Sequence, residues 1–260
     1  MILDTIAAAT RKRVFAAKEI KPLNRLREQA LALPKGDNVF ERALKKDTMS
    51  FICEVKKASP SKGLIAPDFP YLDIAQEYET AGADAVSVLT EPDYFLGNDD
   101  YLTEIRQIIG IPVLRKDFTV DEYQLYEAKI IGADAVLLIC ALLSTRILRD
   151  YIGICVALGL SALVEAHTEA EVQSALDAGA RIVGVNNRNL KTFEVDINTC
   201  VRLRPLVPKD IIFVAESGIR DGADIDRLRE AGVDAALIGE TLMRSTNKKV
   251  VLAGLKGGAL

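Results

Sequence analysis

The sequence predicts an α/β protein of the (β/α)8-barrel (TIM-barrel) class, with a helical extension before the first strand. Its 260 residues suffice for one large domain, and barrels of this class often reach that length as a single unit. A short motif recurs about every fifty residues, which indicates a repeated structural unit. Short apolar runs also alternate with amphipathic stretches along the chain.

The recurring motif marks junctions at which a helix ends and a strand begins. In each copy a helical pattern stops at a glycine, the usual left-handed end of a helix, and an apolar run follows within a few residues. The four copies are AGADAV at 81–86, IGADAV at 131–136, AGARIV at 178–183 and AGVDAA at 231–236.

Eight apolar runs are predicted to be strands. They alternate with helical stretches such as 72–81 and 169–178, and this order requires a parallel sheet with helical crossovers. A closed barrel is favoured over an open doubly wound sheet, since no GxGxxG motif follows the first run. The runs are FICEV at 51–55, AVSVLT at 85–90, IPVLR at 111–115, AVLLICA at 135–141, LSALVEA at 160–166, RIVGVNN at 181–187, IIFVAES at 211–217 and AALIGE at 235–240.

Residues 1–48 are predicted to form the helical extension, and residues 49–260 the barrel, within one domain overall. Apolar residues recur at helical spacing both before and after Pro22. The extension would either plug one end of the barrel or cover the mouth of the active site. The residues at this spacing are Ile2, Ile6 and Ala9, then Leu23, Leu26 and Ala30.

The composition argues against nucleic acid and membranes as partners. The formal net charge of −4 is spread over many lysines and arginines, so an anionic ligand must be held locally. No run of about 18 apolar residues occurs, and the N-terminus lacks the pattern of a secretory signal. We therefore expect a cytoplasmic protein, and a monomer is compatible with the sequence.

Cysteine and histidine usage predicts neither disulfides nor a metal site. The four cysteines form no CxxC pair, and His167 is the single histidine. Cys53 and Cys140 lie in apolar runs and are interpreted as small buried hydrophobes. A lone histidine is more often a loop or capping residue, so His167 is not assigned a catalytic role.

Polar residues gather at the predicted strand ends, where the chemistry of such barrels takes place. Burying several charges near one axis is costly unless they pair or serve a ligand, so their convergence favours an active site. Taken singly, Glu54 and Lys56 could form an ion pair, Lys116 could pair with Asp117 or Glu54, and Glu216 could orient a neighbour. The residues are Glu54, Lys56, Lys116, Glu165, Asn186, Arg188, Glu216 and Ser217.

Two glycine-containing turns predict a phosphate site. Ser217-Gly218-Ile219 follows the seventh predicted strand, and Gly239-Glu240-Thr241 follows the eighth, where a short helix is expected to start. Backbone amides of these two loops are the recurring phosphate cradle of (β/α)8 barrels. Glu240 would contribute its backbone N–H while its side chain turns away.

Seven blocks of the sequence together resemble indole-3-glycerol phosphate synthases in order and spacing. They span all eight predicted strands. The blocks are FICEVKKASPSKG at 51–63, LTEPDYFLGNDDYL at 89–102, VLRKDF at 113–118, ALVEAH at 162–167, VGVNNRNLKTF at 183–193, VAESGI at 214–219 and LIGETLM at 237–243.

The resemblance implies a carboxy-lyase of tryptophan biosynthesis that uses no cofactor or metal. It would convert the phosphorylated small molecule 1-(2-carboxyphenylamino)-1-deoxyribulose 5-phosphate to indole-3-glycerol phosphate, CO2 and water. Lys116 would be the general acid, Lys56 the partner of the substrate carboxylate, and Glu165 the acid or base of dehydration. The remaining residues implied in the catalytic site are Glu54, Asn186 and Ser217, and those implied in substrate binding are Ser59, Pro60, Phe95, Phe118, Arg188, Glu216, Gly218, Gly239 and Glu240.

Two alternatives stay open at this point. A phosphoribosylanthranilate isomerase or another phosphosugar barrel would share the fold, but the isomerase is expected to use a Cys/Asp pair, and Cys53 lies on the opposite strand face from Glu54. A non-catalytic phosphosugar-binding barrel would need the glycines but not Lys116, Glu165 and Asn186 together.

Overall fold

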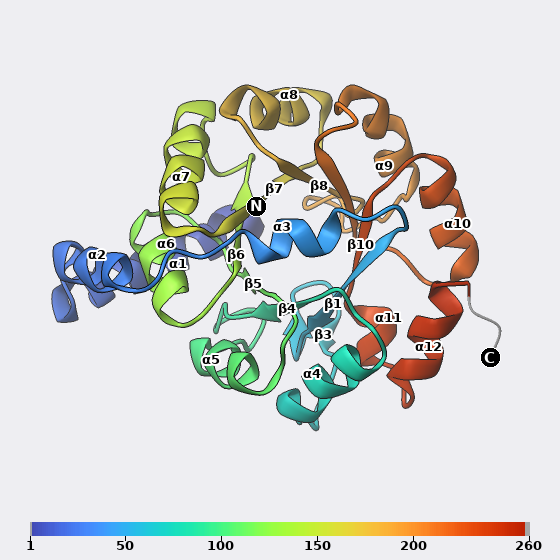
Figure 1. The fold of residues 1–260 in the computed structure, drawn as a ribbon, viewed down its shortest axis with the longest axis horizontal. Helices are drawn as coiled ribbons and strands as arrows, with labels where there is room; N and C mark the ends of the chain where they lie inside the picture. Colours follow the sequence, from blue (N-terminus) through green and yellow to red (C-terminus); the bar gives the residue numbers. More distant parts are fainter. Residues whose placement is uncertain (1, 258–260) are drawn as a thin grey trace.

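A computed structural model describes residues 2–257, and its strands close into an eight-stranded parallel barrel (Figure 1). The order around the barrel is β1-β10-β9-β8-β7-β6-β5-β4, so neighbours in the chain are neighbours in the barrel except for the pair β1 and β10 that closes it. The predicted fold class is confirmed. The strands are β1 (Ser50–Val55), β4 (Ala85–Leu89), β5 (Val113–Lys116), β6 (Ala135–Ile139), β7 (Ser161–Ala166), β8 (Ile182–Asn186), β9 (Ile212–Glu216) and β10 (Ala235–Ile238).

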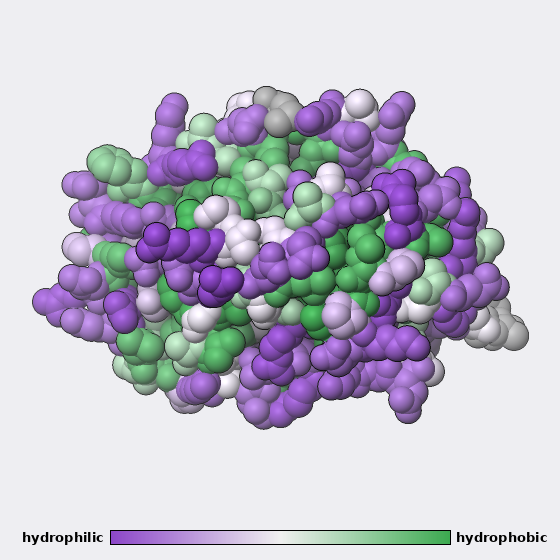
Figure 2. All heavy atoms as spheres, turned by 90° about the horizontal axis from the view of Figure 1, so that it is seen from above, coloured by the Kyte–Doolittle hydropathy of each residue, from purple (hydrophilic) through white to green (hydrophobic). Residues whose placement is uncertain are grey.

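Helices surround the barrel, and a large apolar core fills the space between the two layers. On the face shown in Figure 2, hydrophilic side chains project outward and apolar ones lie mainly in the recesses between them. The helices that follow β1 are α4 (Tyr71–Thr80), α5 (Asp99–Ile108), α6 (Tyr123–Ile130), α7 (Thr145–Leu158), α8 (Glu169–Ala178), α9 (Asn198–Leu203), η1 (Arg204–Leu206), α10 (Gly222–Glu230), α11 (Glu240–Met243) and α12 (Lys248–Leu255).

The aspartates of the recurring motif tie neighbouring strands together. Each accepts a hydrogen bond from a backbone N–H at the start of the preceding strand: Asp84 from Phe51 (2.8 Å), Asp134 from Val113 (2.9 Å) and Asp234 from Phe213 (2.8 Å). The third copy of the motif has Arg181 at this position, which instead pairs with Glu41 at 2.6 Å. The repeat is thus a structural device that fixes successive strands.

The N-terminal segment reaches both ends of the barrel. It contains α1 (Ile2–Ile20), α2 (Leu23–Ala32) and α3 (Val39–Leu44). Phe40 and Leu44 of α3 are fully buried in the cluster that fills the barrel interior, beside the start of β1. In Figure 1 α3 crosses the centre of the barrel, and α1 lies further back. Helix α3 therefore plugs the amino end, while α1 lies at the mouth.

Two details differ from the sequence-based picture. A short hairpin of β2 (Ala58–Ser59) and β3 (Gly63–Leu64) follows β1 and was not predicted. Cys53 is buried as expected, whereas Cys140 is only partly buried because β6 ends at Ile139. Among residues 2–257, no helix combines the length and the apolar character that crossing a bilayer requires.

Candidate active site

A cavity of about 730 Å³ lies at the carboxyl ends of the barrel strands. This volume is in the range of small-molecule sites. Every site residue predicted from the sequence lines it, although the roles given to them stay predictions. These residues are Glu54, Lys56, Ser59, Pro60, Phe95, Lys116, Phe118, Glu165, Asn186, Arg188, Glu216, Ser217, Gly218, Gly239 and Glu240.

Lys116, the last residue of β5, lies between two buried carboxylates. Its Nζ is 2.7 Å from Oε2 of Glu216 on β9 and 3.2 Å from Oε2 of Glu165 on β7. The alternative considered for Lys116, a structural ion pair with Asp117 or Glu54, is not what the described part of the chain shows: Lys116 pairs with Glu165 and Glu216. Asp117, the next residue, instead accepts hydrogen bonds from Arg13 and Thr90.

The three groups control one another's protonation. Burial would lower the pKa of the Lys116 ammonium, but the charges of Glu216, Glu165 and Glu54 outweigh burial and raise it. Burial raises the pKa of Glu216 to about 7, since Lys116 offsets only part of that effect and Glu165 adds a like charge. For Glu165, the charges of Lys116 and His167 outweigh burial and lower the pKa. At neutral pH the site thus holds an ammonium, an ionised Glu165 and a Glu216 close to its midpoint.

A glycine on β8 makes room for Glu216. A Cβ at Gly184 would lie only 2.3 Å from Oε1 of Glu216. Strands β8 and β9 are paired neighbours, so any larger side chain at 184 would displace the carboxylate. A glycine inside a strand often marks such a close approach.

Glu54 and Lys56 form a second ion pair, with Nζ 2.5 Å from Oε2. Gly239, at the end of β10, packs against this pair: a Cβ there would lie 2.4 Å from the Glu54 carboxylate and 2.8 Å from the Lys56 ammonium. Gly239 therefore accommodates the ion pair, besides any contact of its backbone with a ligand. Cys53 faces the outer helices, where burial raises its pKa.

His167 lies behind Glu165. Its Nε2 is 3.4 Å from Oε1 of Glu165, and its Nδ1 is 3.2 Å from Oε2 of Glu171. Burial lowers the pKa of His167, but the hydrogen bond with Glu171 and the charge of Glu165 outweigh it and raise the pKa. The histidine is therefore an electrostatic partner of Glu165 and more than a loop residue.

The turn after β9 has an unusual backbone. Ser217 and Gly218 both adopt positive φ, 66° and 81°. Asn187 holds this turn by donating from Nδ2 to the Ser217 carbonyl at 3.0 Å, and a Cβ at Gly218 would lie 2.2 Å from Val195. A left-handed serine is uncommon and often marks a functional turn. Asn186, at the end of β8, accepts the N–H of Arg188 at 3.0 Å, and its side chain helps to lower the pKa of the buried Glu165.

Basic side chains line one side of the cavity. The Glu240 carboxylate lies 3.3 Å from Lys62 Nζ and 3.1 Å from Arg244 Nε, so its side chain is occupied by cations. Gly239 caps the N-terminus of α11, which begins at Glu240. The basic residues of the lining, besides the buried lysines, are Lys62, Arg188, Arg220, Arg227 and Arg244.

Another part of the cavity lining is apolar and aromatic. The rings of Phe95 and Phe118 lie 6.0 Å apart with a tilt of 41°. Leu3 and Ile6 of α1 join the lining. An aromatic wall, a basic rim and an acid–base centre together suit a ligand that has an aromatic end and an anionic end.

Comparison with known proteins identifies the family. A family model described as "Indole-3-glycerol phosphate synthase" matches residues 3–255. The chain belongs to the indole-3-glycerol phosphate synthase family. Relatives of that name include proteins from Ruminiclostridium cellulolyticum, 60% identical over 260 residues and all of both chains, and from Endomicrobium trichonymphae, 56% identical over 98% of this chain and 100% of the relative.

Solved structures outside this family share the barrel. The 3-hexulose-6-phosphate synthase from Salmonella typhimurium matches with a TM-score of 0.66 at 13% identity, covering 80% of this chain and 97% of that one. A thiamine phosphate pyrophosphorylase from Pyrococcus furiosus matches with a TM-score of 0.60 at 15% identity, covering 84% and 96%. At such identities the likeness shows the fold alone.

Sequence reasoning missed several features of this member of the indole-3-glycerol phosphate synthase family. Gly184 was detectable as a glycine inside the run RIVGVNN, but its partner on β9 was not. His167 was set aside as a lone histidine, although Glu165 and Glu171, the two carboxylates that it contacts, both lie within four residues of it in the sequence. The basic residues Lys62, Arg220, Arg227 and Arg244 lie in loops and helices away from the strand ends and gave no signal of their own.

Proposed function

We propose that this protein closes the indole ring of 1-(2-carboxyphenylamino)-1-deoxyribulose 5-phosphate, releasing CO2, water and indole-3-glycerol phosphate in tryptophan biosynthesis. Membership of the family over nearly the whole chain supports this reaction. The observation that carries the proposal is the Lys116 ammonium held between Glu165 and Glu216, inside a cavity with an aromatic wall and a basic rim.

In the first step the ring carbon that bears the carboxylate attacks the sugar carbonyl. Negative charge develops on the carbonyl oxygen, and a fixed cation aimed at that oxygen lowers the barrier. Lys116 is that cation: its raised pKa keeps it an ammonium until it donates a proton as the new C–C bond forms. Glu216, with its raised pKa, lies 2.7 Å away and returns a proton to the amine.

Loss of CO2 then restores the aromatic ring. The ring became cationic when its carbon attacked the carbonyl, so the bond between that carbon and the carboxylate breaks and its electron pair returns to the ring. Lys56 anchors the carboxylate before this step. Because Lys56 is also paired with Glu54, it binds the substrate carboxylate less tightly than a free ammonium would. Weaker ground-state binding suits this step, since binding that is equally tight in the ground state and the transition state does not speed the reaction.

Dehydration completes the indole. The ring carbon that comes from the sugar methylene loses a proton, the ring nitrogen keeps its own, and the hydroxyl formed from the carbonyl leaves as water with a second proton. One carboxylate and one ammonium suffice for these two transfers. Glu165 is held ionised by Lys116 and His167 and accepts the first proton, while a lysine supplies the second.

The substrate phosphate is assigned to the turns after β9 and β10. Backbone N–H groups of Gly218, Gly239 and Glu240 are the proposed donors. Lys62 and Arg244 lie at the same side, where they already hold the Glu240 carboxylate. Ser59 and Arg188 complete the proposed set.

Two further features belong to this proposal. Residues 1–48 act as part of the barrel unit 49–260, since α1 lines the mouth and α3 the opposite end. The protein works in the cytoplasm, which its free cysteines support, because unpaired thiols are typical of reducing compartments.

A direct assay tests the function. Since the chain contains no tryptophan, no indole fluorescence of the protein itself overlaps that of an indole product. Adding the anilino deoxyribulose phosphate should produce this signal catalytically, and phosphoribosylanthranilate should give none. A protein that isomerises phosphoribosylanthranilate, or that binds the substrate without turnover, would contradict the proposal.

A further inference from the structure

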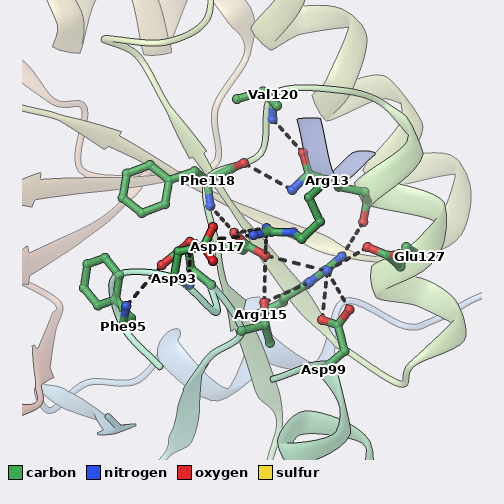
Figure 3. Close-up of polar contacts among 12 residues, drawn as sticks. Arg13, Asp93, Phe95, Asp99, Arg115, Asp117, Phe118, Val120 and Glu127 are labelled. Carbon is green, nitrogen blue, oxygen red and sulfur yellow. Dashed lines mark hydrogen bonds and ion pairs between the residues drawn. The ribbon is translucent and has the colours of Figure 1, made fainter. Parts of the chain in front are cut away.

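A network of charged side chains lies behind the aromatic wall of the cavity (Figure 3). It joins the β5 end, the loop after β4 and the N-terminal helix. Arg115 Nη2 pairs with Asp99 at 2.8 Å and with Glu127 at 2.7 Å. Thr90 Oγ1 accepts from Arg115 Nε at 3.2 Å and donates to Asp117 at 2.9 Å.

Arg13 of α1 binds two carboxylates of this network. Its Nη2 lies 2.9 Å from both oxygens of Asp117, and its Nη1 lies 3.7 Å from Oε1 of Glu91. Both carboxylates are buried. Figure 3 shows Arg13 pointing at Asp117 from one side, while the rings of Phe95 and Phe118 project away on the other.

The same two carboxylates hold the backbone of the two aromatic residues. Asp117 accepts the N–H of Phe118 at 2.8 Å. Glu91 accepts the N–H of Phe95 at 3.1 Å and that of Tyr94 at 2.7 Å. One carboxylate therefore links Arg13 to the backbone of each phenylalanine: Asp117 by hydrogen bonds, and Glu91 by an ion pair on the Arg13 side. The three segments are far apart in the sequence.

The charge balance makes Arg13 necessary. Among the described residues of the network, the carboxylates of Glu91, Asp99, Asp117 and Glu127 face two guanidinium groups, those of Arg13 and Arg115. Removing one guanidinium would leave buried carboxylates that repel one another. Truncating one partner of a buried pair is costly for this reason.

We propose that Arg13 is a positioning residue, through which the N-terminal helix holds Phe95 and Phe118 in place to bind the aryl end of the substrate. The part of this proposal that concerns the aryl ligand rests on the proposed function. The part that concerns Arg13 holding the two loops does not. Leu3 and Ile6 of the same helix line the cavity, so α1 both covers the mouth and sets its aromatic wall.

The test compares Arg13→Met with Lys18→Met. Lys18 joins the same helix to the same loop through Asp121 at 2.7 Å, but this pair is about one third exposed and Asp121 does not hold either phenylalanine. Arg13→Lys keeps the positive charge, but a single ammonium cannot replace two guanidinium nitrogens that contact Asp117 and Glu91 separately. It is the variant to test if Arg13→Met fails to fold.

Two readouts separate positioning from plain stability. Hydrogen exchange should quicken at residues 91–95 and 117–120 in Arg13→Met and not in Lys18→Met. Binding of indole-3-glycerol phosphate should weaken about tenfold in Arg13→Met, a factor typical of a lost aromatic contact, while binding of glycerol 3-phosphate stays unchanged. Arg13→Lys should fall between Arg13→Met and the parent.

The proposal is overturned if exchange in the two loops and binding of the aryl ligand match the parent protein, even if the melting temperature falls. It is also overturned if Lys18→Met changes both readouts equally. A parent protein that closes no indole ring would refute the proposed function, and the hydrogen exchange would still decide whether Arg13 holds the two loops.

Discussion

Replacing Lys116 by methionine removes the ammonium at the centre of the site and keeps most of the apolar stem. Nζ is the cation that lies 2.7 Å from Glu216 and 3.2 Å from Glu165, so the change should remove the charge that stabilises the developing oxyanion. Loss of a positioned general acid typically costs about 10²–10⁴ in rate. We expect kcat to fall by that factor in a folded barrel.

The same change should also reduce stability, in a way that depends on pH. Breaking a buried ion pair by removing one partner costs about 3–5 kcal/mol. Without Lys116 the two glutamates face each other, so their pKa values in the folded state rise above those in the unfolded chain. The folded protein then binds more protons than the unfolded one, and stability falls as pH rises. The melting temperature of Lys116→Met should therefore drop further below the parent between about pH 5 and about pH 8.

The assay measures kcat by indole fluorescence and the melting temperature on the same sample. Lys248→Met is the matched control: the Lys248 side chain is 12% exposed, against 13% for Lys116, and it pairs with Glu77 at 3.4 Å away from the cavity. Lys248→Met should keep its kcat. Near-parental kcat in folded Lys116→Met would refute the catalytic assignment.

Three more predictions follow from the geometry. His167→Asn removes a positive charge that lowers the pKa of Glu165. The acidic limb of the pH profile of kcat/KM should therefore move to higher pH. An unmoved limb would show that His167 does not act on Glu165. Gly184→Ala should lower kcat about tenfold or more, because the new Cβ would displace the Glu216 carboxylate and small misplacements of a catalytic group are costly. Gly153→Ala is the control and should keep its kcat, since no atom lies within 4 Å of the new Cβ. Equal activities of the two variants would contradict this packing. Inorganic sulfate should compete with substrate and raise the melting temperature. Non-competitive inhibition would contradict the assignment of the phosphate site to the turns after β9 and β10.

The barrel was predictable because its signals are local. Each apolar run and each glycine that ends a helix can be read within a few residues, and the eight strands follow from them. The β2–β3 hairpin was not predictable on that basis, since its strands are two residues each and Gly63–Leu64 is exposed. The role of α1 and α3 at opposite ends of the barrel depends on packing that no local pattern encodes.

The site was predictable in membership but less so in pairing. Residues at the carboxyl ends of the strands converge in any (β/α)8 barrel. The site residues predicted from the sequence therefore line one cavity. Glu54 and Lys56, two residues apart, do form the ion pair that their spacing allowed. The partners of Lys116 come from two other strands, whereas Asp117 follows Lys116 but binds Arg13.

A single-turnover experiment tests the central claim most directly. With protein in excess over 1-(2-carboxyphenylamino)-1-deoxyribulose 5-phosphate, indole formation and CO2 release are followed together for the parent and for Lys116→Met. The account predicts one indole and one CO2 for each substrate with the parent protein, and both slowed by the same large factor in the variant. Substrate recovered unchanged from the parent protein, or equal rates for the two proteins, would contradict it.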